Sequence, residues 1–332
     1  MHKSPFNTLS TSIIKLSKFY NYGSQSRMRV PILILFVTFA SFCNPTNGDP
    51  ISMDDYQFDY DLENPSEHYK LPSYLEEISG LSYYGNGKIA CVQDEKAIIY
   101  VLNLEKEKII EKYDFGEDAD YEDIAIVGKK AYILRNNGHI FRVNNFKKKD
   151  FKVKKFNTPL KEKNDSEGLA YDPLSNTLLI ACKGSPSIQK ENLYTGYKAV
   201  YSFDLEKEEL IKEPHFLIDL KRLDTYIDHN RFAKLSVKVA KKLGLIESET
   251  SFQPSGIAVH PIFGEIYIIS SVGKLLVILD RRGKVLDVKE LDPKLFRQPE
   301  GICFSPTGDM FISNEGQGGK GYILKFNYHA EK

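Results

Sequence analysis

Three glutamates occupy the same place in a recurring pattern of the sequence. Glu122, Glu167 and Glu300 each stand directly before the same kind of short apolar segment, as in Glu-Gly-Leu-Ala and Glu-Gly-Ile-Cys. Carboxylates that are brought together raise one another's pKa or require a cation that neutralises them. Calcium takes about six to eight oxygen ligands in a tolerant geometry. The pattern therefore predicts a calcium site formed by these glutamates and the aspartates close to them in sequence: Asp120, Asp123 and Asp165. The alternative is a structural turn in which each carboxylate accepts backbone N–H hydrogen bonds.

A second set of polar residues ends the next apolar segment of each pattern. Arg135 and Lys183 are its cationic members, and an arginine can hold a phosphate or carboxylate through two parallel hydrogen bonds. Alternatively, these two cations pair with Glu122 and Glu167. We expect the second set to complete a site for a metal ion or a small anionic ligand: Asp94, Arg135, Lys183, Asn314 and Glu315.

The pattern recurs because the chain contains an internal repeat. Segments such as Gly-Leu-Ala-Tyr and Gly-Ile-Ala-Val return at intervals of about 44 residues, with one interval about twice as long. Each copy continues as four short apolar segments separated by turn residues such as Gly and Asp, which indicates four β-strands. A repeat of this length with four strands has the size of one β-propeller blade. The equivalent first positions are Gly80, Asp123, Gly168, Gly256 and Gly301.

We therefore predict an all-β fold, a β-propeller of about five four-stranded blades, with six blades as the alternative. The innermost strand of each blade lines the central channel, so the repeated glutamates should converge on one mouth. A strand within residues 56–71 should complete the last blade, because the final repeat ends after its third strand. We assign the long interval to a polar loop at 185–198 and a short helical insertion near 220–250 rather than to a sixth blade.

We predict that residues 1–49 contain an export signal and a tether. Residues 50–332 are predicted to form a single propeller domain. Val30–Phe42 is apolar but shorter than the roughly 20 residues that span a bilayer as a helix, and it follows a basic residue, as in a signal peptide. Met28 is a second candidate start. The segment ending in Cys43 resembles a lipobox in which that cysteine is lipidated, although Phe42 departs from the pattern. Simple secretion is the alternative.

Composition narrows the classes of function further. The net charge is zero, the basic residues near the N-terminus leave the remainder mildly acidic, and no basic stripe supports nucleic-acid binding. Beyond Cys43 the chain has three cysteines, an odd number that cannot form a complete disulfide framework. We therefore expect buried free thiols at Cys91, Cys182 and Cys303. The sequence contains no recognisable catalytic triad, nucleophile elbow or zinc-protease motif.

Several of these segments together resemble a known family. Gln-Pro-Ser-Gly-Ile-Ala-Val-His-Pro, Arg-Gln-Pro-Glu-Gly-Ile-Cys-Phe-Ser-Pro and Asp-Ser-Glu-Gly-Leu-Ala-Tyr-Asp-Pro look like the SdiA-regulated (YjiK/CarP) family over about residues 70–328. The resemblance implies a propeller exported to the bacterial cell envelope, often lipid-anchored and in one branch associated with calcium. It also implies a distant similarity to NHL-type and calcium-dependent phytase-like propellers.

Three functions follow as expectations. The first is an exported, calcium-associated binding or sensing module of the envelope, found as an outer-membrane lipoprotein or as a periplasmic or secreted protein, with a lipid anchor as its only membrane attachment. The second is an enzyme, a calcium-dependent phosphoesterase of phytase-like type, in which the metal activates water. The third is a scaffold that binds a protein or glycan through the loops at 185–198 and 220–250. We favour the non-enzymatic alternatives.

Overall fold

The computed structural model describes residues 56–148, 150–190, 192–229 and 252–329, all of which belong to the compact unit Pro50–Lys332. The predicted signal segment, Met28 and Cys43 lie outside these residues, as does the remainder of the 220–250 insertion beyond residue 229. No helix among the described residues is long and apolar enough to cross a membrane.

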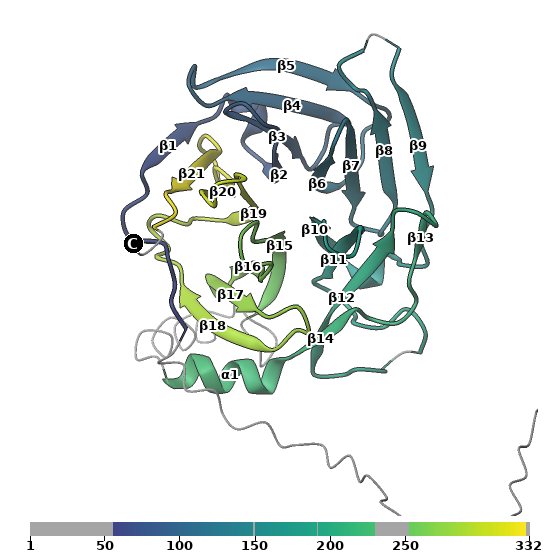
Figure 1. Cartoon of the computed structure of the whole chain (residues 1–332), viewed down its shortest axis with the longest axis vertical. Coiled ribbons are helices and arrows are strands. Elements are labelled where there is room, and N and C mark those ends of the chain that lie inside the picture. The colour runs from purple at the N-terminus through teal and green to yellow at the C-terminus, as the bar shows by residue number, and fades with distance from the viewer. Residues whose placement is uncertain (1–55, 149, 191, 230–251, 330–332) are drawn as a thin grey trace, which may run out of the picture. The chain divides into compact units, whose positions relative to one another are not determined.

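The described chain forms a ring of five antiparallel blades, which confirms the predicted propeller (Figure 1). In each blade the strands follow one another outward from the axis, so that β2, β6, β10, β15 and β19 surround the centre. Blade 1 contains β2 (Ile78–Tyr83), β3 (Lys88–Gln93), β4 (Ile98–Asn103) and β5 (Lys108–Asp114). Blade 2 contains β6 (Tyr121–Val127), β7 (Lys130–Arg135), β8 (Ile140–Asn144) and β9 (Lys152–Phe156).

The remaining three blades follow the same order, with one irregular outer strand. Blade 3 contains β10 (Ser166–Asp172), β11 (Thr177–Cys182) and β12 (Tyr197–Asp204), and its outer position is shared by β13 (Glu209–Leu210) and β14 (Phe216–Asp219). Blade 4 contains β15 (Gln253–Val259), β16 (Ile266–Val272), β17 (Leu275–Leu279) and β18 (Val285–Glu290). Blade 5 contains β19 (Pro299–Phe304), β20 (Met310–Asn314), β21 (Tyr322–Phe326) and β1 (Glu67–Lys70).

The last blade joins the two ends of the chain. β1 pairs antiparallel with β21, so that Glu67 lies opposite Lys325 and Lys70 opposite Tyr322. This confirms that an N-terminal strand completes the final repeat and protects what would be an open sheet edge. The helix α1 (Leu220–His229) follows β14 and contacts β14 and β18, which places a helix in the predicted insertion. Two 3₁₀ helices, η2 (Ser73–Leu75) and η3 (Glu162–Asn164), precede inner strands.

Apolar side chains fill the spaces between blades. Five buried clusters each combine residues of two neighbouring blades, so the core is a continuous ring. Strands such as β17 are buried along their whole length, which is why their sequences are apolar on both sides. Cys91, Cys182 and Cys303 are buried free thiols in this core.

Glycines let the inner strands meet at the axis. A Cβ on Gly256 would lie 2.5 Å from the carbonyl oxygen of Glu300, and one on Gly301 would lie 2.7 Å from that of Ser79. Asp123 takes the place of the repeated glycine in blade 2. Its side chain fills the space beside Gly80. Only glycine permits such close backbone approach.

Candidate functional site: the acidic mouth

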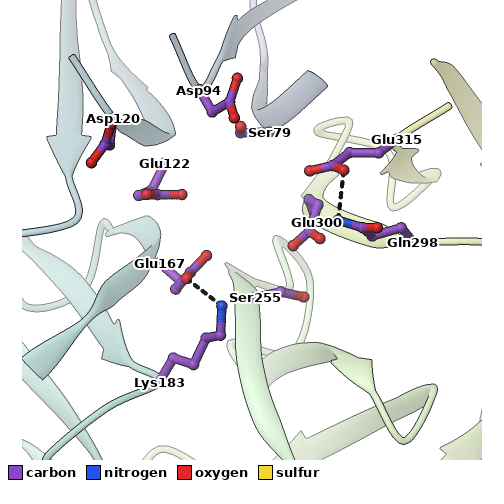
Figure 2. A pocket seen from close by; sticks show the side chains of 10 residues that line it. All are labelled: Ser79, Asp94, Asp120, Glu122, Glu167, Lys183, Ser255, Gln298, Glu300 and Glu315. Carbon is purple, nitrogen blue, oxygen red and sulfur yellow. Dashed lines mark hydrogen bonds and ion pairs between the residues drawn. The ribbon is translucent and has the colours of Figure 1, made fainter. Parts of the chain in front are cut away.

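One mouth of the channel is a polar pocket of about 210 Å³. Six carboxylates from four blades line it, and a single lysine is its only cationic residue. Figure 2 shows these side chains arranged around a common space. The lining residues are Ser79, Asp94, Asp120, Glu122, Glu167, Lys183, Ser255, Gln298, Glu300 and Glu315.

Each blade has a β-bulge that turns one glutamate or serine of its inner strand toward this pocket. In every blade the register between the inner strand and the second strand shifts at the residue directly before the repeated position. Such a bulge leaves one residue unpaired and re-aims its side chain. The bulged residues are Ser79, Glu122, Glu167, Ser255 and Glu300.

Burial and mutual repulsion make these carboxylates hard to ionise. Burial raises the pKa of Glu122 to about 9, with a further contribution from Glu167. Burial likewise raises the pKa of Glu300 to about 8, that of Glu315 to about 7 and that of Asp94 to about 6. The pocket therefore takes up protons when nothing else neutralises it.

The charges in the pocket are only partly compensated. Lys183 Nζ lies 2.8 Å from Glu167 Oε1 and 3.9 Å from Asp165. Burial alone lowers the pKa of Lys183, but these carboxylates raise it overall, so the lysine stays charged. Gln298 donates a hydrogen bond of 2.5 Å to Glu315. The buried Oδ1 of Asp94 has no hydrogen-bond partner among the described residues.

The structure brings most of the sequence-predicted residues to this mouth. Glu122, Glu167, Glu300 and Asp120 line the pocket from the first set, and Asp94, Lys183 and Glu315 from the second. Lys183 pairs with Glu167, as one of the two alternatives predicted.

Four predicted residues lie apart from the pocket lining. Both oxygens of the buried Asp123 accept backbone N–H bonds of 2.7 Å, from Ile124 and Leu169, which is the structural alternative. Asp165 directly follows η3 and is only partly buried. Arg135 and Asn314 are the last residues of β7 and β20, and neither lines the pocket.

Sequence reasoning did not single out Gln298. It lies before the bulge of blade 5 and binds both Glu315 and Gln317. Its position two residues before Glu300 matches that of Asp120 before Glu122, and this parallel is the signal that could have identified it.

The donor set of the pocket suits a hard cation, because every lining acid supplies oxygen. Asp94 Oδ1 in particular is a buried oxygen that a cation could satisfy. In the conformations of the structure, however, no three His, Cys, Asp or Glu side chains of the described ranges lie close enough together to form a ready-made metal site.

The opposite mouth has a different character. Its pocket of about 280 Å³ is lined largely by apolar residues that follow the repeated glycines, with Tyr83, Ile126, Tyr171, Val259 and Pro261 among them. The same inner strands thus carry carboxylates at one end and apolar side chains at the other.

These features define a five-bladed propeller with one acidic and one apolar mouth. The chain belongs to the SdiA-regulated family, whose model matches residues 51–317. This confirms the resemblance found in the sequence.

Solved structures are similar to the chain at low sequence identity. A glutaminyl cyclase from Myxococcus xanthus is 12% identical, covers 81% of this chain and 97% of its own, and gives a TM-score of 0.52. A PQQ-bound aldose sugar dehydrogenase from Streptomyces coelicolor is 11% identical, covers 80% and 97%, and gives a TM-score of 0.46. At 12% identity the likeness to the glutaminyl cyclase concerns the fold alone. No curated protein matches the sequence.

Proposed function

We propose that this protein is an exported binding or sensing module of the cell envelope whose acidic mouth holds a divalent cation, calcium. The observation that carries the proposal is the pocket of six carboxylates opposed by one lysine. The propeller fold and the family are consistent with a binding or scaffold module.

Calcium suits this mouth on chemical grounds. It binds carboxylate and carbonyl oxygens in variable numbers and geometry, so carboxylates from several blades can share one ion. Glu122, Glu167, Glu300 and Asp94 would hold it, and Asp94 Oδ1 would gain the partner that it lacks. A bound cation would also lower the pKa values that burial raises, because opposite charge favours the ionised form.

The pocket gives less support to an anionic ligand or a phosphate ester. Its one cation, Lys183, is already paired with Glu167, and Arg135 does not line the pocket. A phosphate entering here would face carboxylates on most sides, which like-charge repulsion opposes. We therefore do not propose phosphoesterase activity. Export and lipidation at Cys43 rest on the sequence of residues 28–43.

Thermal unfolding of the full chain tests the proposal, in chelator, in calcium and in magnesium. A ligand that binds only the folded state stabilises it by about 2.7 kcal/mol at a hundredfold excess over its dissociation constant. We expect calcium to raise the midpoint by several degrees and magnesium to raise it less, because magnesium demands a stricter octahedral geometry.

Matched variants locate the effect. The double variant E122Q/E300Q should lose most of the calcium shift, whereas E105Q, in the exposed turn between β4 and β5, should keep it. If calcium leaves the midpoint unchanged, or if E122Q/E300Q responds like the unmodified chain, the acidic mouth is not the calcium site. A scaffold function would then be the remaining alternative.

A further inference from the structure

Three large apolar side chains project from the rim of the apolar mouth. Leu174 is 75% exposed, Ile262 49% and Phe263 53%. Leu174 lies in the turn between β10 and β11, and Ile262 and Phe263 lie in the turn between β15 and β16. The two turns are adjacent, since a Cβ on Gly264 would lie 3.7 Å from the Leu174 side chain. We call these three residues the apolar rim.

The apolar rim continues into the pocket of the apolar mouth. Pro173 and Pro261, the residues directly before Leu174 and Ile262, both line that pocket. The exposed side chains and the pocket lining therefore form one apolar region. Such a region on a water-soluble surface indicates a contact with a partner.

A buried stack holds the ring of Phe263 in place. Phe263 stacks on the ring of His260, with centroids 5.1 Å apart and an interplanar angle of 11°. His260 Nε2 lies 2.8 Å from the hydroxyl of Tyr60, which donates to the carbonyl oxygen of Gly308. Burial lowers the pKa of His260 to about 4, so the ring is neutral at physiological pH. A fixed apolar side chain loses little conformational entropy when it is buried by a partner.

Exposed basic side chains stand beside the rim. Two acids close to it have partners: Asp172 pairs with Arg281, and Glu265 accepts a hydrogen bond from the hydroxyl of Tyr56. The turn between β17 and β18 carries two of these basic side chains. The side chain of Arg282 is 92% exposed, and its Nε lies 3.8 Å from Asp280 Oδ2. Lys284 is also exposed.

The chain also enters the propeller on this face. The first described residue, Tyr56, hydrogen-bonds to Glu265 and Tyr267 beside the rim. Residues 43–55 separate it in sequence from the apolar run Val30–Phe42, and an extended chain of that length reaches at most about 45 Å. A lipid on Cys43, the predicted lipidation site, would therefore bring a membrane within reach of this face.

We propose that the apolar rim inserts into the interface of an anionic lipid membrane, with the acidic mouth facing away from it. Exposed apolar side chains beside exposed Arg and Lys are the combination that binds such an interface, through buried apolar area and attraction to anionic headgroups. The proposal concerns the opposite face from the calcium site and does not depend on it.

The absence of tryptophan from the chain allows a site-specific test. In the full chain, F263W places an indole on the rim, and Y74W places one on Tyr74, which is 44% exposed and stands before β2 at the acidic end. Both variants keep residues 1–55, so attachment through that segment is the same for both. Each is mixed, in chelator, with vesicles of phosphatidylethanolamine and phosphatidylglycerol whose acyl chains carry bromine, a contact quencher.

We expect the F263W fluorescence to shift to the blue and to lose at least half its intensity, while Y74W changes little. Replacing Leu174 and Ile262 by Ser in the F263W background should reverse most of the quenching. Equal quenching of both indoles, or none of F263W, would overturn the proposal. A blue shift of F263W that rises with protein concentration without vesicles would also overturn it, because a second copy of the chain would then cover the rim.

Discussion

The two mouths of the propeller are built by the same five inner strands and yet differ completely in chemistry. Before the repeated glycine, the bulged residue leaves the regular pairing and points into the pocket, and at three of five places it is a glutamate. After the glycine, the strands pair regularly and carry apolar residues such as Leu81, Leu169 and Ile302. One short repeat can therefore supply two separate sites, because the residues before and after the repeated position line different pockets.

The largest expected effect comes from Asp123, the residue at the repeated position of blade 2. Asp123→Ala removes the acceptor of two buried N–H groups, those of Ile124 and Leu169, and each unsatisfied buried donor costs about 1–3 kcal/mol. We expect the free energy of unfolding to fall by roughly 2–6 kcal/mol, measured by denaturant titration of the full chain. Asp280→Ala, which removes two similar bonds in an exposed turn, should cost clearly less. Equal losses would mean that the N–H groups bound by Asp123 cost no more to leave unpaired than those of an exposed turn.

A side chain added at the axis should have the next largest effect. Gly256→Ala places a Cβ 2.5 Å from the carbonyl oxygen of Glu300, so the inner strands must move apart. Overpacking of this kind costs about 1–3 kcal/mol. Gly116→Ala, where a Cβ meets nothing within 4 Å, should change stability by about 0.5 kcal/mol or less. The same denaturant titration compares the two, and similar values would contradict close contact at the axis.

The smallest expected effect is the pH dependence that the acidic mouth alone confers. Folding raises the pKa of Glu122 to about 9 and that of Glu300 to about 8, so the folded state binds more protons than the unfolded state. This contribution to stability is complete below the ordinary glutamate pKa and is lost as pH rises through the raised values.

In chelator, stability should therefore fall between about pH 5 and pH 9, on the order of 1 kcal/mol for each group, because the pocket is open to water that screens the charges. E122Q should show a shallower decline than the unmodified chain, whereas E105Q should follow it. Calcium should flatten the curve of the unmodified chain. A decline equally steep in E122Q would mean that this glutamate ionises as readily in the folded state as in the unfolded one.

The sequence was sufficient to predict the blades and much of the acidic mouth. The repeat of about 44 residues fixed where each inner strand begins, and equivalent positions of a ring must meet at one end, so Glu122, Glu167 and Glu300 could be brought together without coordinates. The closing strand followed from a final repeat that lacked its fourth segment.

The second set of site residues was harder to place because successive side chains along a strand point to opposite faces of the sheet. Asp94, Lys183 and Glu315 directly follow β3, β11 and β20 and line the pocket. Arg135 and Asn314 end their strands one position earlier and do not. Strand ends are uncertain by a residue or two from sequence alone, and here one residue decides the outcome. The structural role of Asp123 depends on packing against Gly80, which no local pattern reveals.

The blade that unites β1 with β21 has a consequence for the synthesis of the protein. Glu67 pairs with Lys325, so β1 waits for its partner until β21 has left the ribosome. Until then the ring cannot close, and both neighbours of the gap expose apolar faces. Pairing over so long a separation is slow, and the growing chain is therefore open to chaperones, proteases or an export machinery until its last strand arrives.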